Sequence, residues 1–294
     1  MSQSGTRTAF IVTKPSQLMV ALTILNENAL HGDVTILFCD SFYDARNVEC
    51  RFKRAVTPRI LSNFCKTRIH AIKFAASQGF DVLYIDSDVG VQHYIALLGF
   101  RLRNPFCRVN VFEEGLGPYT EDTHTGLQRA IRNILGIGSN FGGSAFTSCI
   151  YLYNPDEYIA KFPKQSKKAI LIRTPIWEFI GKNHKVLEAI FGIDSYSEDN
   201  KVTRFCYIYM TGHHIDNEFL TNFKSNEDKL FIKYHPHIGN PLEVDGVQVL
   251  STSTPIEYIL YELLCVYDKI IIYDHNSAAR RYVLDTRVSF RSIH

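Results

Sequence analysis

The sequence predicts an α/β fold made of two Rossmann-like units, each built on a mainly parallel sheet. Short runs rich in β-branched and aromatic residues alternate with stretches of helical periodicity through most of the chain. One polar segment interrupts this alternation, which then begins again. With 294 residues, 46% of them hydrophobic, the chain is long enough to form two domains with buried cores.

The N-terminal half contains strand-like runs that are each followed by a helical stretch or a turn. Lys14-Pro15-Ser16 predicts the turn after the first strand. We expect these elements to form a first domain, residues 1–160. Its predicted strands are 8–13, 34–38, 82–85 and 108–112, and its predicted helices are 17–28, 58–78 and 91–102.

A polar and basic stretch at 161–168 and a polar stretch at 195–201 indicate a connecting segment, residues 161–198. A second domain, residues 199–294, follows. Since ligands of open α/β sheets bind at the carboxyl ends of the strands, we expect a central cleft between the two domains. The predicted strands of the second domain are 204–210, 229–234, 247–250 and 269–273, and its predicted helices are 215–223, 255–266 and one that begins near Asn276.

Composition excludes several classes of protein. The 32 basic and 30 acidic residues nearly cancel, which argues against a nucleic-acid partner. The seven cysteines include no CxxC pair, as expected for reduced, buried thiols in a cytosolic protein rather than a disulfide framework or a zinc site. We find no signal peptide and no apolar stretch of about 18 residues, so we expect a cytoplasmic protein without a membrane span.

The first candidate site is an acidic pair at the end of a predicted strand. Glu113, Glu114 and Gly115 directly follow the buried-type run 109–112. Adjacent carboxylates at a strand end can place one side chain in a cleft, and their mutual repulsion can raise one pKa toward that of a general base. A solvated turn before the next helix explains the same residues equally well.

Two further candidates lie in the second half. Lys233, His235 and Pro236 occur where a predicted strand ends, and an imidazole there can donate to a phosphate on a leaving group. Asn276 and Ser277 stand at a strand end before a helix, where free backbone N–H groups favour anions. These positions are equally typical of a structural histidine and of ordinary helix caps.

A hydroxyl-rich turn, residues 251–254, precedes a helix that Pro255 suits as its first residue. Ser251 and Thr252 belong to this turn, and Glu257 lies on the first helical turn. A carboxylate at this position either complements the helix dipole or accepts hydrogen bonds from ribose hydroxyls.

In this order, the acidic-acidic-Gly, His-Pro and Ser motifs resemble the bacterial sialyltransferases of the GT-B type, which include lipooligosaccharide, capsular and polysialic acid transferases. The opening run 10–18 is also similar to the start of those enzymes. The resemblance implies two Rossmann-type domains with a central cleft, an acceptor-side first domain and a donor-binding second domain. Asn276 departs from the pattern, which usually has two hydroxyl residues in a row, so residues 251–254 are an alternative hydroxyl cluster.

The resemblance implies an inverting transfer of sialic acid from CMP-sialic acid to a galactoside hydroxyl of a bacterial surface glycan, with no metal or other cofactor. Glu113 would be the general base and Glu114 the alternative, while His235 would stabilise the departing phosphate. The remaining roles would be nucleotide binding by Lys233, Pro236, Ser251, Thr252, Glu257, Asn276 and Ser277, and substrate binding by Thr13, Asp86 and Gly115.

Two other functions compete with this hypothesis. Asp86-Ser87-Asp88 resembles the metal-binding Asp-X-Asp of GT-A transferases, in which hard oxygen ligands hold Mn²⁺ or Mg²⁺. A non-catalytic module that binds a nucleotide sugar or a glycan would keep the cleft without needing Glu113. Basic clusters at 51–54, 101–103, 161–168 and 280–291 also raise the hypothesis of a peripheral contact with the inner membrane, although solvated faces explain them too.

Overall fold

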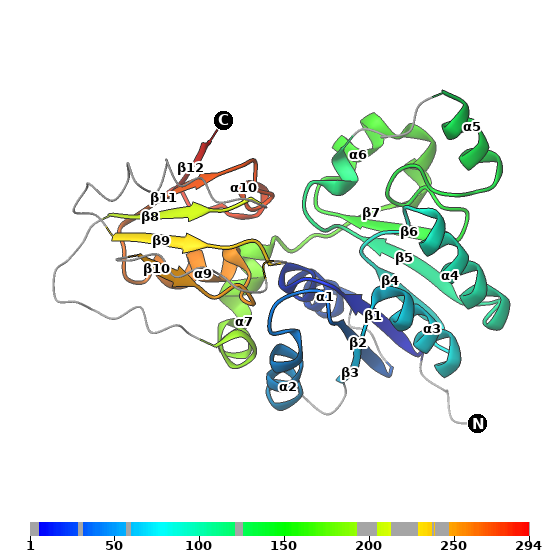
Figure 1. The fold of residues 1–294 in the computed structure, drawn as a ribbon, viewed down its shortest axis with the longest axis horizontal. Coiled ribbons are helices and arrows are strands. Elements are labelled where there is room, and N and C mark those ends of the chain that lie inside the picture. Colours follow the sequence, from blue (N-terminus) through cyan, green and yellow to red (C-terminus); the bar gives the residue numbers. More distant parts are fainter. Residues whose placement is uncertain are drawn as a thin grey trace. The chain divides into compact units, whose positions relative to one another are not determined.

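The computed structural model describes residues 6–28, 32–56, 60–120, 126–192, 205–212, 229–236, 238 and 247–293. They belong to two compact units, one of Met1–Ser41 and Ala45–Pro175 and the other of Phe42–Asp44 and Ile176–His294. Both units carry a parallel sheet, as predicted (Figure 1). The predicted helix 215–223 lies outside the described residues.

Sheet A of the first unit has seven strands in the order β3-β2-β1-β4-β5-β6-β7, and all its pairings are parallel. Its strands are β1 (Thr8–Val12), β2 (Val34–Cys39), β3 (Ile60–Cys65), β4 (Val82–Ile85), β5 (Arg108–Phe112), β6 (Thr147–Leu152) and β7 (Ala169–Leu171). Its helices are α1 (Pro15–Asn28), α2 (Ala45–Ala55), α3 (Arg68–Gln78), α4 (Val91–Arg103), α5 (Gly126–Ile134) and α6 (Pro155–Lys161), with 3-10 turns η1 (Gly117–Tyr119) and η2 (Pro163–Lys168).

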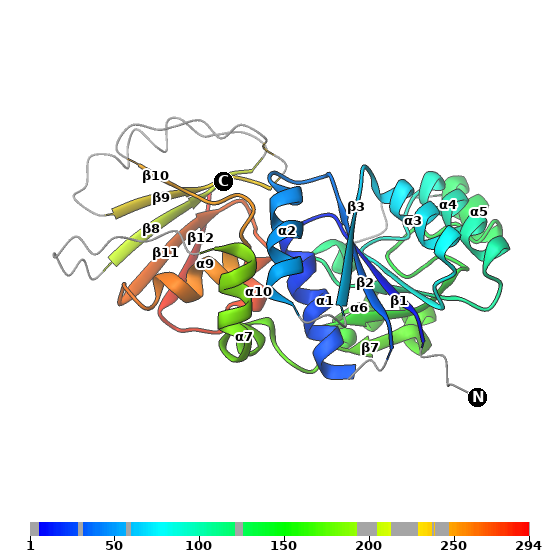
Figure 2. The same cartoon turned by 90° about the horizontal axis from the view of Figure 1, so that it is seen from below.

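Helices cover both faces of sheet A. Figure 2 shows α1 and α2 on one side and α3, α4 and α5 on the other. Ala75 of α3 and Leu97 and Phe100 of α4 are buried in one core with Ile11 of β1 and Val111 of β5. Burying a side chain such as Leu97 contributes ~1.5–3 kcal/mol, so these contacts hold α3 and α4 against the sheet.

The predicted helix 58–78 is wrong in its first half, because Ile60–Cys65 forms strand β3 at the edge of sheet A. Four of these six residues are only partly buried, so the apolar run that marks the central strands is absent here. The helix begins later, where the Thr67 side chain accepts a hydrogen bond from the His70 backbone N–H at 3.1 Å. It ends at Gly79, whose φ of 68° is the left-handed conformation of a helix C-cap.

The segment 161–198, expected to connect the domains, contains regular structure over its described part. Strand β7 pairs with β6 and completes sheet A, while α7 (Ile176–Phe191) belongs to the second unit. The units therefore divide at Pro175 and Ile176. The polar, basic composition of 161–168 reflects the exposed turn η2 rather than a linker.

Sheet B of the second unit has the order β10-β9-β8-β11-β12, again with parallel pairing throughout. Helix α9 buries Ile259, Leu260 and Leu263 against one face of this sheet, and Trp177 of α7 meets Tyr261 of α9 at 5.6 Å between ring centroids. The elements are β8 (Phe205–Met210), β9 (Lys229–Lys233), β10 (Gln248–Leu250), α9 (Ile256–Leu263), β11 (Lys269–Asp274), α10 (Ala279–Tyr282) and β12 (Val288–Ser292).

Each sheet reverses its strand order once. The chain moves outward from β1 to β3 and then crosses back to β4, and it repeats this pattern from β8 through β10 to β11. Such switch points open a crevice at the carboxyl ends of the strands, where ligands of α/β sheets bind. The predicted side chains lie along these carboxyl edges. In sheet A, Asp86 follows β4 and the two acids follow β5, and in sheet B, His235 follows β9 and the turn 251–254 follows β10.

Candidate functional site

Asp86 is the centre of a polar cluster at the switch point of sheet A. Its side chain is 3% exposed, and its Oδ2 accepts hydrogen bonds from Gln17 Nε2 at 2.9 Å, from Thr13 Oγ1 at 3.3 Å and from the Arg68 guanidinium. Burial raises the pKa of Asp86, and the Arg68 charge opposes this shift. Its Oδ1 is buried and has no hydrogen-bond partner among the described residues.

Asp88 serves a different purpose from Asp86. It is fully buried, and its carboxylate accepts hydrogen bonds from the backbone N–H groups of Gly142 and Ser144, both at 2.9 Å, and from Thr147 Oγ1 at 2.6 Å. These bonds fasten the loop before β6 to the end of β4. Burial raises the pKa of Asp88, while the three donors act in the opposite direction.

The Asp-X-Asp alternative therefore has no support from geometry. Asp86 faces an arginine and Asp88 faces N–H and O–H donors, so both carboxylates already bind groups that would compete with a cation. Over the part of the chain that the structure describes, no group of three or more His, Cys, Asp or Glu residues is arranged to hold a metal.

The two predicted acids have separate surroundings. Glu113 is fully buried, and its Oε2 accepts hydrogen bonds from the Tyr119 hydroxyl and, at 2.7 Å, from the Tyr153 backbone N–H. Glu114 is partly exposed, and its Oε1 lies 2.8 Å from Lys14 Nζ at the end of β1. Gly115 has a φ of 67°, so the glycine permits the left-handed turn that follows the acids. Glu114 is thus the acid that a substrate can reach.

At the carboxyl edge of sheet B, His235 follows β9 and is partly exposed. Its backbone N–H donates to Thr211 Oγ1 at 3.2 Å, which fixes it beside the end of the neighbouring strand β8. Its carbonyl accepts from the Ile238 N–H at 2.9 Å, so Pro236 lies inside a tight turn. These hydrogen bonds hold the backbone of His235 at the carboxyl edge of sheet B.

The turn 251–254 lies beside β9. Lys233 is 4% exposed, and its ammonium donates to the Ser251 carbonyl at 2.7 Å. Ser251 Oγ lies 3.1 Å from both Ser253 Oγ and Thr254 Oγ1, and Thr252 is buried. A buried cation and several hydroxyls thus meet before α9, whose first turn carries the buried Glu257.

Phosphate binding at Asn276 and Ser277 stays a prediction, because the backbone donors of this turn have partners within the turn. The Ser277 N–H donates to Asp274 Oδ2 at 2.9 Å, and the Ala279 N–H donates to Ser277 Oγ at 3.2 Å, so these donors are already used. Helix α10 has only four residues, and its Arg280 pairs with Asp274. Asn276, with a φ of 59°, is exposed and serves the turn.

Sequence reasoning missed Arg68, Lys14 and Gln17, which complete the cluster at the edge of sheet A. Gln17 follows the first strand at the spacing of a first helical turn, a signal that was available in the sequence. Arg68 was hidden because the prediction placed it inside a longer helix, whereas it is the first residue of α3. Only the position of β3 brings it to the strand ends.

The fold resembles that of several solved structures. UGT89C1 from Arabidopsis thaliana, solved in complex with UDP, matches 94% of this chain and 76% of its own, with a TM-score of 0.55 and 9% identity. The wall teichoic acid polymerase TagF, soaked with CDPG, matches 92% of this chain at a TM-score of 0.53 and 12% identity, and the chain spans 66% of it.

A protein from Listeria monocytogenes assigned as a UDP-N-acetylglucosamine 2-epimerase matches 92% of this chain and 74% of its own, with a TM-score of 0.52 and 10% identity. No family model and no curated protein matches the sequence. At these identities the likeness concerns the fold alone. The chain has the GT-B-like fold that its sequence predicted, with two Rossmann-type sheets.

Proposed function

We propose that this protein is a glycosyltransferase that moves a sugar from a nucleotide-activated donor to a hydroxyl of a glycan acceptor. One observation carries the proposal: in a GT-B-like fold, reactive side chains gather at the carboxyl edge of each sheet. A reachable carboxylate and a polar cluster mark sheet A, and a histidine, a buried lysine and hydroxyls mark sheet B. The acceptor would bind at the first edge and the donor nucleotide at the second.

The proposed chemistry is a single inverting displacement. The acceptor oxygen forms a bond to the anomeric carbon, the bond from that carbon to the phosphate oxygen breaks, and the nucleotide leaves with the electron pair. Glu114 takes the acceptor proton, because Glu113 is enclosed by Tyr119 and Tyr153. Asp86 supports this edge from inside, since it holds Thr13, Gln17 and Arg68 in place while its own carboxylate is buried.

His235 donates to the departing phosphate in this mechanism. Lys233 has a supporting role, because its ammonium is buried and holds the turn 251–254 in place. The partly exposed Ser251 contributes the hydroxyl nearest to the ligand. Glu257 remains our proposed ribose contact, on the evidence of its position in the first turn of α9.

CMP-sialic acid is the donor that we propose, from the resemblance of the three motifs to bacterial GT-B sialyltransferases. The acceptor would be a galactoside of a bacterial surface glycan. The solved structures of similar fold point to the wider class, since one was solved with UDP and another with CDPG. A panel of CMP-, UDP- and CDP-activated donors therefore tests the class and the specific donor together.

The test is release of the nucleotide from each donor over a panel of galactosides, in the presence of EDTA. We expect CMP release from CMP-sialic acid, and we expect Glu114→Gln to lower kcat by ~100-fold or more because general-base catalysis contributes ~10²–10⁴. His235→Ala is expected to lower kcat by ~10-fold or more through the loss of charge stabilisation. Glu178→Gln is the matched control, since Glu178 also pairs with a lysine but lies on the exposed side of α7.

The other outcomes each identify a different function. Turnover of UDP- or CDP-sugars but not of CMP-sialic acid would support the proposal of a glycosyltransferase and contradict the proposal that sialic acid is transferred. Complete dependence on a divalent cation would favour a metal-assisted reaction, and tight nucleotide binding without turnover would indicate a binding module. Near-normal turnover by Glu114→Gln would remove Glu114 from the mechanism.

A further inference from the structure

Helix α4 carries a second apolar stripe that faces away from the core. Leu97 and Phe100 are buried against sheet A. Val91, Ile95, Leu98 and Leu102 recur every three or four residues, so they share one side of the helix, and all four are exposed. Leu102 is 75% exposed, and Phe106 in the turn after the helix is 97% exposed. Single exposed apolar residues are ordinary, whereas a continuous stripe marks an interaction surface.

Helix α5 also carries an exposed apolar stripe. Leu127, Ile131, Ile134 and Leu135 follow the same helical spacing and are exposed, with Leu127 at 77% and Ile134 at 83%. Figure 2 shows α5 on the same side of sheet A as α4. The Tyr94 hydroxyl of α4 donates to the Leu135 carbonyl at 2.7 Å, which ties the end of α5 to α4.

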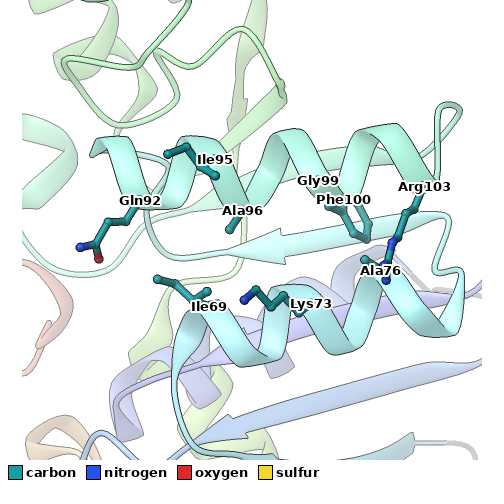
Figure 3. A pocket seen from close by; sticks show the side chains of 9 residues that line it. All are labelled: Ile69, Lys73, Ala76, Gln92, Ile95, Ala96, Gly99, Phe100 and Arg103. Atoms are coloured by element: carbon teal, nitrogen blue, oxygen red, sulfur yellow. The ribbon is translucent and has the colours of Figure 1, made fainter.

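A groove of about 580 Å³ runs between α3 and α4 on the same side of sheet A (Figure 3). Ala76, Ala96 and Gly99 leave it open, since a Cβ built on Gly99 would meet no atom within 4 Å. Ile69 and Ile95 are apolar parts of its lining, and Lys73 and Arg103 are its charged residues.

The charge of this side has a single sign. Helices α3, α4 and α5 contain no Asp or Glu. Lys73 and Arg103 are exposed and Arg101 and Arg132 are partly exposed, whereas Arg68 pairs with Asp86. Glu121 and Asp122, before α5, lie outside the described residues. Exposed apolar residues beside lysine and arginine are the pattern of a surface that enters the headgroup region of an anionic bilayer.

We propose that the face formed by the α3–α4 groove, the outer stripe of α4 with Phe106, and the stripe of α5 docks onto an anionic lipid bilayer. A second copy of the chain fits it less well, because a two-fold contact would set the same basic groups against one another. This inference is independent of the proposed function, since docking requires neither donor nor acceptor.

The test is co-sedimentation of the purified chain with vesicles of phosphatidylcholine alone or with about one-third phosphatidylglycerol. We expect binding to the anionic vesicles only, and weaker binding at ~0.5 M salt, where charges are screened over a few ångströms. Leu102→Ser with Phe106→Ser, and separately Lys73→Gln with Arg103→Gln, are each expected to lower the partition coefficient by ~10-fold or more.

The control variants change exposed residues elsewhere in the chain. Val266→Ser with Leu284→Ser removes two exposed apolar side chains of the second unit, and Lys164→Gln with Lys167→Gln removes two exposed charges of η2. Both pairs should bind vesicles like the native chain. An unchanged thermal midpoint verifies that a variant folds. If one of the variants of the face does not fold, Leu127→Ser with Ile134→Ser on α5 is tested in its place.

Equal binding to both vesicle types, no binding to either, or control pairs that weaken binding as much as the face variants would overturn the proposal. A concentration-dependent dimer that Leu102→Ser with Phe106→Ser dissociates, together with no vesicle binding, would assign the face to a second copy instead.

Discussion

Asp86 and Glu113 illustrate how burial decides what an acidic residue does. Both stand at the carboxyl ends of central strands, and both are inaccessible to solvent except at a few atoms. Glu113 Oε2 accepts hydrogen bonds from Tyr119 and Tyr153, whereas Asp86 Oδ1 has no hydrogen-bond partner in the described chain. Glu113 and Glu114 are adjacent in the sequence but differ in burial, so they do not have equivalent roles. Glu114 rather than Glu113 is our proposed base.

Asp86 leads to a pH prediction. Because burial raises its pKa, the folded chain holds the proton more tightly than the unfolded chain, in which the pKa is about 3.9. Its stability contribution is therefore complete below that pKa and is lost as the pH rises through the raised value. An asparagine at this position cannot ionise, so the Asp86→Asn variant does not lose this stability as the pH rises.

We expect the thermal midpoint of Asp86→Asn, measured relative to the native chain, to rise as the pH increases from about 4 toward neutrality. Removal of the partner of Arg68 lowers the variant's midpoint at every pH, so the change with pH is the informative quantity. A midpoint difference that stays constant across this range would contradict the raised pKa.

At the scale of elements, Asp88 connects two segments that are far apart in the sequence. Its three hydrogen bonds hold residues 142–147 to the end of β4 and so direct the chain into β6. Lys168 from η2 supports the same loop, since its ammonium donates to the Gly142 carbonyl at 3.1 Å and the Ser144 carbonyl at 3.0 Å.

Asp88→Asn is expected to destabilise the chain by ~1–3 kcal/mol, because the amide nitrogen would face buried N–H or O–H donors. Urea unfolding measures the change in free energy. Asp156→Asn, in the first turn of α6, is the control and should change it by less than ~0.5 kcal/mol. If Asp88→Asn left the free energy of unfolding unchanged, water or a shifted loop would be satisfying these donors.

For the whole molecule, the division at Pro175 predicts where the chain can be separated. Residues 1–175 contain all seven strands of sheet A, whereas residues 1–160 lack β7 and η2 and leave the edge of β6 unpaired. We expect the longer fragment to unfold cooperatively and the shorter one to melt ~5 °C or more lower. Circular dichroism during heating compares them, and equal midpoints would show that β7 adds no stability.

No helix among the described residues is long and apolar enough to cross a membrane. The seven cysteines are all free thiols, and burial raises the pKa of Cys39 and of Cys206 to about 12. Four cysteines are buried and two are exposed, so the expectation of buried thiols holds for most but not for Cys50 and Cys265.

The sequence by itself determined the fold class and most strands, because β-rich runs such as 34–38 and 82–85 are nearly uniformly apolar when both faces of a sheet are covered. It also located Glu114 and His235 at strand ends. The tertiary structure alone decided where β3 runs, since an edge strand lacks that apolar signal, and hence that Arg68 reaches Asp86. It likewise decided which acid is enclosed and which amides are occupied, because hydrogen-bond partners such as Tyr153 and Asp88 come from distant parts of the chain.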